Sequence, residues 1–181
     1  MHTATPHIIV LETQDRTPRS VPMNGFISYA HDDVNLVDGF RPHLRAIERG
    51  FRINFWSDPR THAGQQWTSE ISKRIDDADV FILLISPNSI ASEYIYEKEM
   101  PAIKARRRDA AALVIPVVLS RCCWPMVADE LEPVPTVAKR LKPIADWRPR
   151  DHGFDCARAQ IGEAVKAYFG IAPIGTGWTS Q

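Results

Sequence analysis

The amino-acid sequence predicts an α/β fold in which helices cover both faces of a parallel sheet. Short apolar segments alternate along the chain with segments whose apolar residues recur at helical spacing, which is typical of strand–helix–strand units. The run Val80–Ile85 is apolar at every position, which indicates a strand buried on both faces, as in parallel sheets. The sequence therefore predicts a doubly wound sheet, and the pattern leaves the order of its strands open.

The first half of the chain contains two predicted strands and two predicted helices. Phe26–Tyr29 is short and apolar, and Phe51–Trp56 alternates between apolar and polar side chains, so both are predicted strands. The helix between them is expected to begin at an N-cap, Asp32 or Asp33, and to stop at Gly50. The apolar positions of this helix and of the next one are Val37, Phe40, Leu44 and Ile47, followed by Ile71, Ile75 and Ala78.

The second half contains three more predicted strands. Val80–Ile85 is the third, Leu113–Leu119 is the fourth, and Leu141–Trp147 is a weaker fifth. A helix that ends in a basic cluster lies between the third and fourth strands. A final amphipathic helix is predicted from the spacing of Ala157, Ile161, Val165, Tyr168 and Phe169.

Length and charge restrict the classes of function. A chain of 181 residues has the length of one domain with short extensions. Lysine plus arginine and aspartate plus glutamate balance at 22 each, which gives no support to a nucleic-acid partner. Residues 1–22 are predicted to be an N-terminal extension, and residues 170–181, with three glycines and a proline, a flexible tail.

The cysteines and the apolar runs indicate a cytoplasmic protein. The three cysteines are odd in number and form no C-x-x-C pair, so neither a disulfide framework nor a zinc site is predicted. The sequence has no secretory signal pattern, and no apolar run approaches the roughly 20 residues of a membrane span. We therefore expect no membrane partner, no metal and a reducing compartment.

Glu99 is the residue most indicative of chemistry. If the segment after the third strand is helical, Glu99 shares a face with Ile95, Ala102 and Ile103, all apolar. Burying a carboxylate on an apolar face is costly. The segment also follows the end of a predicted central strand, where ligands bind in open parallel sheets. Glu99 is therefore a candidate catalytic residue, and a structural role bonded to amides or to a cation is the alternative.

Several segments, in order, resemble a TIR domain of the bacterial stand-alone or effector type. Phe26–Tyr29 with the acidic turn after it resembles the opening strand of that family. Phe55–Asp58, leading to Gly64 and Trp67, resembles the second strand and the loop that follows it. Ala78–Pro87 resembles the third strand with its serine–proline exit. The next motif, Ser92, Tyr94 and Glu99, resembles the segment that carries a glutamate in this family. The last, Ile115–Leu119 with Trp124, resembles its fourth strand.

The resemblance covers residues 23–169 and implies a flavodoxin-like fold. The family has a five-stranded parallel sheet in the order 2-1-3-4-5 with helices on both faces. Some members are enzymes that cleave the nicotinamide–ribose bond of NAD+, and others are adaptors that only assemble. Glu99 of this chain corresponds to the catalytic glutamate of the NAD+-cleaving members. Many members carry a tryptophan four residues before that glutamate, whereas here Tyr94 lies five before, so Glu97 is a second candidate.

The resemblance also implies substrate-binding and assembly residues. Tyr29, Ala30 and His31 lie in the first strand-to-helix loop, where a nucleotide is expected to rest against backbone amides. Tyr94 offers a ring for stacking on a base or on nicotinamide, with ordinary packing as the alternative. Ser86 is expected to reach a ribose or, alternatively, to cap the next segment. The family uses the loop after the second strand in TIR–TIR contacts, and its candidate residues are Asp58, Arg60, His62 and Gly64.

The expected function is therefore an NAD+ nucleohydrolase or cyclase that gives nicotinamide and linear, cyclic or conjugated ADP-ribose. NAD+ is then a substrate, and no cofactor is required. Assembly is expected to activate it, in bacterial antiphage defence, with a separate sensor or effector protein as partner. Two alternatives stay open: a non-enzymatic TIR adaptor, and an enzyme like a nucleoside deoxyribosyltransferase, which also uses a glutamate against a ribosyl centre.

Overall fold

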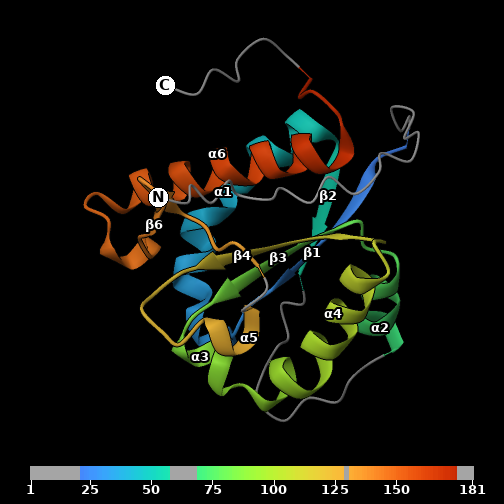
Figure 1. The fold of residues 1–181 in the computed structure, drawn as a ribbon, viewed down its shortest axis with the longest axis horizontal. Helices are drawn as coiled ribbons and strands as arrows, with labels where there is room; N and C mark the ends of the chain where they lie inside the picture. The colour runs from blue at the N-terminus through green and yellow to red at the C-terminus, as the bar shows by residue number, and fades with distance from the viewer. Residues whose placement is uncertain (1–20, 58–68, 129–130, 175–181) are drawn as a thin grey trace, which may run out of the picture.

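The computed structural model describes residues 21–57, 69–128 and 131–174. The chain folds into three layers, with a parallel sheet between two sets of helices (Figure 1). The sheet strands are β1 (Met23–Ser28), β2 (Ile53–Trp56), β3 (Val80–Ile85) and β4 (Leu113–Val118). The α-helices are α1 (Val34–Phe51), α2 (Ser69–Asp76), α3 (Pro87–Ala91), α4 (Met100–Arg108), α5 (Pro125–Ala128) and α6 (Arg150–Phe169). The 3-10 and π-helical turns are η1 (His31–Asp33), η2 (Ile95–Glu99) and η3 (Ile144–Asp146).

The strands of the sheet lie in the order β2-β1-β3-β4, and every pairing is parallel. This confirms the predicted parallel sheet and the first four places of the expected order. The third strand has the predicted bounds, and all six of its residues are buried. β1 and β3 lie at the centre, so the connections after them leave the sheet at its topological switch point. In open α/β sheets that point is where ligands bind.

The predicted fifth strand at Leu141–Trp147 is wrong. Among the described residues, Val134 makes a single parallel bridge to Val117 beside β4. Arg140–Leu141 (β6) instead pairs with Thr136–Val137 (β5) in a two-stranded antiparallel ribbon. Within the described ranges the sheet therefore has four strands, with one bridge at the expected fifth position.

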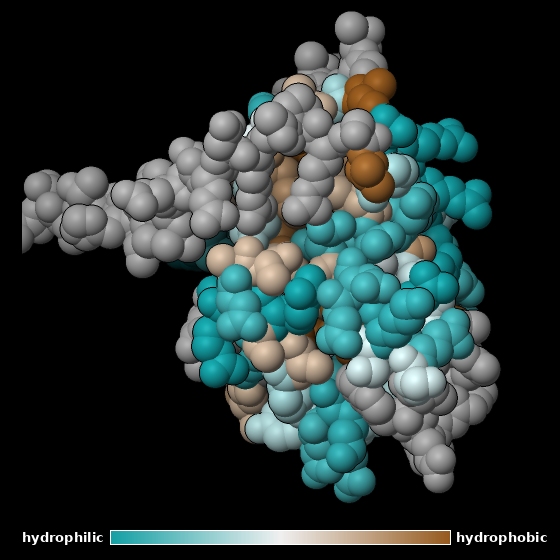
Figure 2. Space-filling view, turned by 90° about the vertical axis from the view of Figure 1, so that its right-hand side faces the viewer, coloured by the Kyte–Doolittle hydropathy of each residue, from teal (hydrophilic) through white to brown (hydrophobic). Residues whose placement is uncertain are grey.

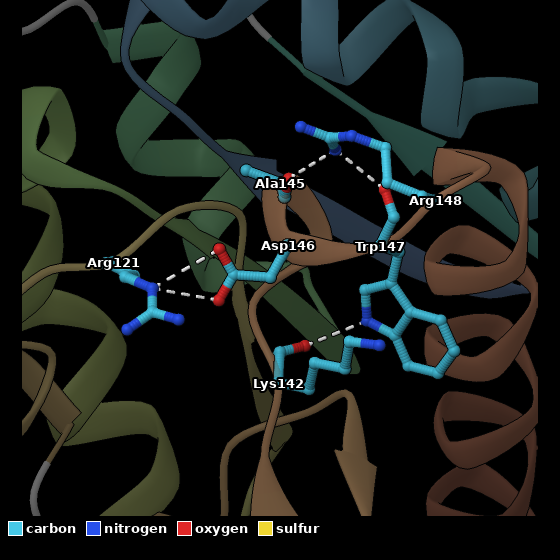
Figure 3. A network of polar contacts seen from close by, with 6 residues as sticks. All are labelled: Arg121, Lys142, Ala145, Asp146, Trp147 and Arg148. Atoms are coloured by element: carbon cyan, nitrogen blue, oxygen red, sulfur yellow. Dashed lines mark hydrogen bonds and ion pairs between the residues drawn. The ribbon is translucent and has the colours of Figure 1, made fainter.

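Proline and side-chain contacts explain why no ladder forms there in the described part of the chain. Pro116 lies in the edge strand β4 and has no N–H to offer a neighbour, and its carbonyl accepts from the Val134 amide at 2.9 Å. Beyond β6, Trp147 Nε1 donates to the Lys142 carbonyl at 3.0 Å, and Arg121 Nε forms an ion pair with Asp146 at 3.0 Å (Figure 3). These contacts hold residues 142–148 in a folded turn instead of an extended strand.

Each face of the sheet has its own apolar core. Alternate β1 side chains point to opposite faces: Ile27 contributes to the cluster under α1 and α6, and Phe26 to the cluster under α2 and α4. In Figure 1, α1 and α6 lie above the sheet, whereas α2 to α5 lie below it. The side on which α2 and α4 lie faces the viewer in Figure 2, and its described surface is mostly hydrophilic. Both helices therefore present an apolar face to the sheet and a polar face outward.

Two predicted helices run close to expectation. α1 buries Val37, Phe40 and other members of its predicted apolar face, but it does not stop at Gly50. It continues to Phe51 and ends where Arg52 adopts a left-handed conformation, with φ 55°. α6 buries Ala157, Ile161 and the rest of its predicted stripe except Tyr168. No helix in the described part of the chain has the length and hydropathy needed to cross a bilayer.

Gln160 joins α6 to the irregular segment after β4. Its amide oxygen accepts from the Thr136 amide at 2.9 Å, and its amide nitrogen donates to the Thr136 carbonyl at 2.7 Å. We expect Gln160→Ala to lower the free energy of unfolding by about 1–3 kcal/mol, because two partly buried backbone groups lose their partner. Urea unfolding monitored by circular dichroism measures the change. Lys166→Ala, at an exposed position of the same helix, is the control, and equal midpoints for the two variants would contradict the assignment.

Candidate functional site

Glu99 lies below the sheet, with its carboxylate buried. Its side chain is 2 % exposed, and the apolar neighbours predicted for it are there: Ile95 and Ile103 are buried in the core cluster on this face. Glu97, the second candidate, is exposed. The structure therefore confirms the apolar surroundings predicted for Glu99, and it places Glu97 at the surface.

Proline explains the local backbone around Glu99. Ile95–Glu99 forms a π-helical turn, closed by a hydrogen bond from the Met100 amide to the Ile95 carbonyl. Pro101 lies in the first turn of α4, where it cannot donate to the Glu97 carbonyl and its ring crowds that carbonyl. A switch to the wider π spacing accommodates this, and such turns are frequent at functional sites. The wide turn places Ile95, Glu99 and Met100 all inside.

Ser28 is the polar partner of Glu99 on the sheet. Its Oγ donates to Glu99 Oε2 at 2.5 Å, and Ser28 itself is 4 % exposed. Ser28 ends β1, where its backbone pairs with Leu83 of β3. The sequence prediction omits this residue, although a signal exists: Ser28 is the polar residue inside the apolar segment Phe26–Tyr29.

A second buried network joins the loop after β1 to the loop after β3. Asp33, a predicted helix N-cap, does stand at the N-cap position of α1, but its side chain makes no capping bond there. It turns inward, where it accepts from the Ser86 hydroxyl and, at 2.8 Å, from Asn88 Nδ2. Asp33 therefore ties together two loops at the carboxyl edge of the central strands.

Ser86 is wholly buried and acts as a helix cap. Its Oγ accepts from the Ser89 amide at 3.1 Å, and Ser89 Oγ accepts from the Ser86 amide at 2.9 Å, which makes a capping box for α3. This confirms the capping alternative of the sequence prediction. A ribose contact by Ser86 stays a prediction, and it requires the Ser86–Asp33 bond to rearrange.

Disrupting the second network should cost stability. We expect Asp33→Ala to lower the free energy of unfolding by about 1–3 kcal/mol, because the buried Ser86 hydroxyl and the Asn88 amide lose their acceptor. Asp33→Asn keeps one acceptor oxygen and should lose less. Urea unfolding measures both, with the exposed neighbour variant Asp32→Ala as the control. A loss in Asp32→Ala as large as in Asp33→Ala would contradict this role.

The first-loop residues lie in different environments. Tyr29 is buried in the core cluster under α1 and α6, so its side chain lies on the face opposite to Ser28. Ala30 is buried on the face of Glu99, and His31 begins η1 and is exposed. Because the Tyr29 side chain is buried, a nucleotide in this loop could contact Tyr29 only through its backbone. Nucleotide contacts with the loop stay predictions.

Tyr94 lies at the start of the π-helical turn. Its ring is partly buried and packs against the core cluster that includes Ile95 and Met100. This contact agrees with the packing alternative, while stacking on a ligand stays a prediction. The loop residues Asp58, Arg60, His62 and Gly64 lie outside the described residues.

Two cavities among the described residues lie near the helices below the sheet and beyond β4. A groove of about 710 Å³ between α4 and β4 is lined by Met100, Ile103 and Lys104 among others. A smaller one of about 300 Å³ lies beyond β4, near Arg121 and Trp124. Glu99 lines neither of these two cavities, and its 2 % exposure shows that little of it meets solvent in this conformation.

The cysteine beyond β4 has no sign of activation. Burial raises the pKa of the Cys122 thiol, and the nearby Cys123 and Asp33 add to the rise against a bond from the Trp124 backbone. A raised pKa favours the neutral thiol over the nucleophilic thiolate. Cys122 is partly buried and packs against the core cluster below the sheet.

Known proteins resemble this chain along most of its length. A family model for the TIR domain matches residues 26–155. The uncharacterized protein y4lF of Sinorhizobium fredii (strain NBRC 101917 / NGR234) is 34% identical over 142 residues, and the match covers 78% of this chain and 42% of that protein. This chain thus spans less than half of that relative. The TIR domains of the activated Roq1 resistosome, which directly recognizes the pathogen effector XopQ, match 83% of this chain and 85% of that chain, at 17% identity and a TM-score of 0.47.

The family match covers the part of the chain that carries the site. It runs from within β1 into α6, and so includes Ser28, Asp33, Ser86 and Glu99. It gives no support to the deoxyribosyltransferase alternative. The chain belongs to the TIR domain family.

Proposed function

We propose that this TIR domain cleaves the nicotinamide–ribose bond of NAD+, with Glu99 as the catalytic carboxylate. The observation that carries the proposal is the position of Glu99, which is buried among apolar side chains and bonded to Ser28 at the carboxyl end of a central strand. A carboxylate in such surroundings is costly to bury unless polar partners offset the cost, and ionisable groups in such places cluster at functional sites. Membership of a family that includes NAD+-cleaving enzymes supports a function.

One carboxylate suffices for the chemistry. The bond between ribose C1′ and the nicotinamide nitrogen breaks, and its electron pair stays on nitrogen, which neutralises the positively charged ring. The sugar is left with oxocarbenium character, as in glycoside hydrolysis. Glu99 would stabilise that developing positive charge more strongly in the transition state than in the substrate. Water then adds to C1′ and releases one proton, giving ADP-ribose.

The nature of the product depends on access of water. A site that admits water yields ADP-ribose, while a shielded site lets a hydroxyl or amine of the nucleotide or of another molecule take C1′. The product would then be a cyclic or conjugated ADP-ribose signal. We place this activity in a bacterial antiphage pathway of the cytoplasm, with a separate sensor or effector protein. The antiphage pathway and the separate sensor or effector protein are proposed from the resemblance to the bacterial members of the family.

Burial of Glu99 supports activation by assembly. At 2 % exposure the carboxylate cannot meet a ribose until the elements around it move. Contacts between copies are one source of the required free energy, and the family's loop after the second strand lies between β2 and α2 here. We therefore expect specific activity to rise with protein concentration.

Purified protein at a series of concentrations, incubated with NAD+, tests the proposal. Chromatography separates nicotinamide, ADP-ribose and cyclic products. We expect nicotinamide release whose rate per molecule increases with concentration. Constant activity per molecule would contradict activation by assembly, and no release at any concentration, including under crowding, would contradict cleavage.

Burial of Glu99 also supports a second candidate function. A carboxylate closed to solvent and bonded to Ser28 can be a structural residue of an adaptor that acts only by TIR–TIR self-association. The same concentration series distinguishes the two functions when it is followed by light scattering. An adaptor forms larger particles as concentration rises and releases no nicotinamide.

A further inference from the structure

Ser28 places a hydroxyl in the mostly apolar layer that also holds the Glu99 carboxylate. The side chains of Phe26 and Ala30, two residues before and after it, belong to the core cluster under α2 and α4. Ser28 points to this same face, because side chains alternate along a strand. It is 4 % exposed, and its Oγ donates to Glu99 Oε2. The hydroxyl therefore meets the carboxylate inside the molecule, away from bulk water.

The geometry of this contact is that of a strong hydrogen bond. The distance of 2.5 Å between Ser28 Oγ and Glu99 Oε2 lies in the range of a hydroxyl that donates to a carboxylate. Such a bond replaces part of the hydration that the carboxylate loses on burial. It also selects Oε2 as the carboxylate oxygen that faces the sheet.

Ser28 is held on a rigid element, while Glu99 lies on a less regular one. The Ser28 backbone is at the end of β1 and pairs with Leu83 in the centre of the sheet. Glu99 is the last residue of a five-residue π-helical turn, whose spacing differs from that of the helix after it. The hydrogen bond therefore ties the carboxylate to the sheet. Sites supported by strands hold their geometry more closely than sites on irregular segments.

We propose that Ser28 is a positioning residue for Glu99 in the cleavage reaction, an inference that rests on the proposed function. Ser28 transfers no proton and takes no part in bond making. Its hydroxyl holds the carboxylate where the positive charge of the ribosyl group develops. Loss of this bond should therefore weaken stabilisation of the transition state more than binding of NAD+.

Three variants at position 28 test this role in the nicotinamide-release assay at a fixed, high protein concentration. Ser28→Ala removes the donor. Ser28→Thr keeps a hydroxyl on a side chain that suits a strand, and Ser28→Cys nearly keeps the volume with a weaker donor. We expect Ser28→Ala to lower kcat by about 10- to 100-fold, the scale of a small misplacement of a catalytic group. KM should change by less than about threefold, since binding is little affected.

The order of the rates separates positioning from a merely structural role. We expect kcat to follow the strength of the donor, with Thr nearest to the wild type, Cys intermediate and Ala lowest, while thermal midpoints follow packing. Wild-type kcat in Ser28→Ala, or a loss expressed in KM alone, would overturn the role of Ser28. Glu99→Gln in the same assay tests the proposed function separately. Wild-type protein without activity, or Glu99→Gln with full activity, would overturn that function and the role of Ser28 with it.

Discussion

Glu99→Gln should abolish nicotinamide release while the fold remains intact. Glutamine has nearly the shape of glutamate, and its amide oxygen still accepts a bond from the Ser28 hydroxyl, so the buried site keeps its packing and this contact. It carries no negative charge, so it cannot stabilise the sugar cation electrostatically. We expect the rate to fall by at least about 100-fold, the scale of losing one preorganised electrostatic group.

Chromatography of nicotinamide gives the rate, and thermal unfolding gives the fold control. A midpoint within a few degrees of the wild type assigns the loss of activity to chemistry. Retention of more than a tenth of the wild-type rate would contradict a catalytic role for Glu99. A large fall in the midpoint would show that the carboxylate is needed for stability, as the structural alternative holds.

Phe81→Ala should have the largest effect on stability. Phe81 lies in β3, the strand paired on both sides, and is fully buried on the face of Glu99. Its ring centroid lies 5.9 Å from that of Phe26. The truncation removes apolar contacts and leaves a cavity in the centre of the layer, so we expect a loss of about 3–5 kcal/mol in the free energy of unfolding.

Urea unfolding followed by circular dichroism measures this loss. Tyr96→Ala is the matched control, because Tyr96 is an aromatic residue below the same sheet with half of its surface exposed. It should lose less than about 1 kcal/mol. Comparable losses in the two variants would mean that the layer between the sheet and α4 is not the packed core described above.

The sequence predicts the buried centre of this fold better than its edge. The run Val80–Ile85 needs apolar side chains on both faces, so the pattern marks its ends correctly. Val134 makes one bridge beside the proline of the edge strand β4, and Gln160 of α6 holds Thr136 two residues later. Such contacts join residues that are distant in sequence, so the local hydrophobic pattern does not predict them.

The candidate site also combines a feature that local sequence predicts with features that depend on distant contacts. Glu99 is predictable because three apolar residues at helical spacing surround it, and that spacing is local. Its partner Ser28 lies 71 positions earlier, so its role depends on how the sheet and the helix pack. The apolar spacing does not reveal the π-helical turn, although Pro101 is a local signal for it.

The sharpest experiment compares Glu99→Gln with Glu97→Gln in one preparation and one assay. The two residues lie two positions apart in the same turn, but Glu99 is buried and Glu97 is exposed. We predict that Glu97→Gln releases nicotinamide from NAD+ at the wild-type rate and that Glu99→Gln releases almost none. Full activity in Glu99→Gln together with its loss in Glu97→Gln would contradict the catalytic role of the buried carboxylate.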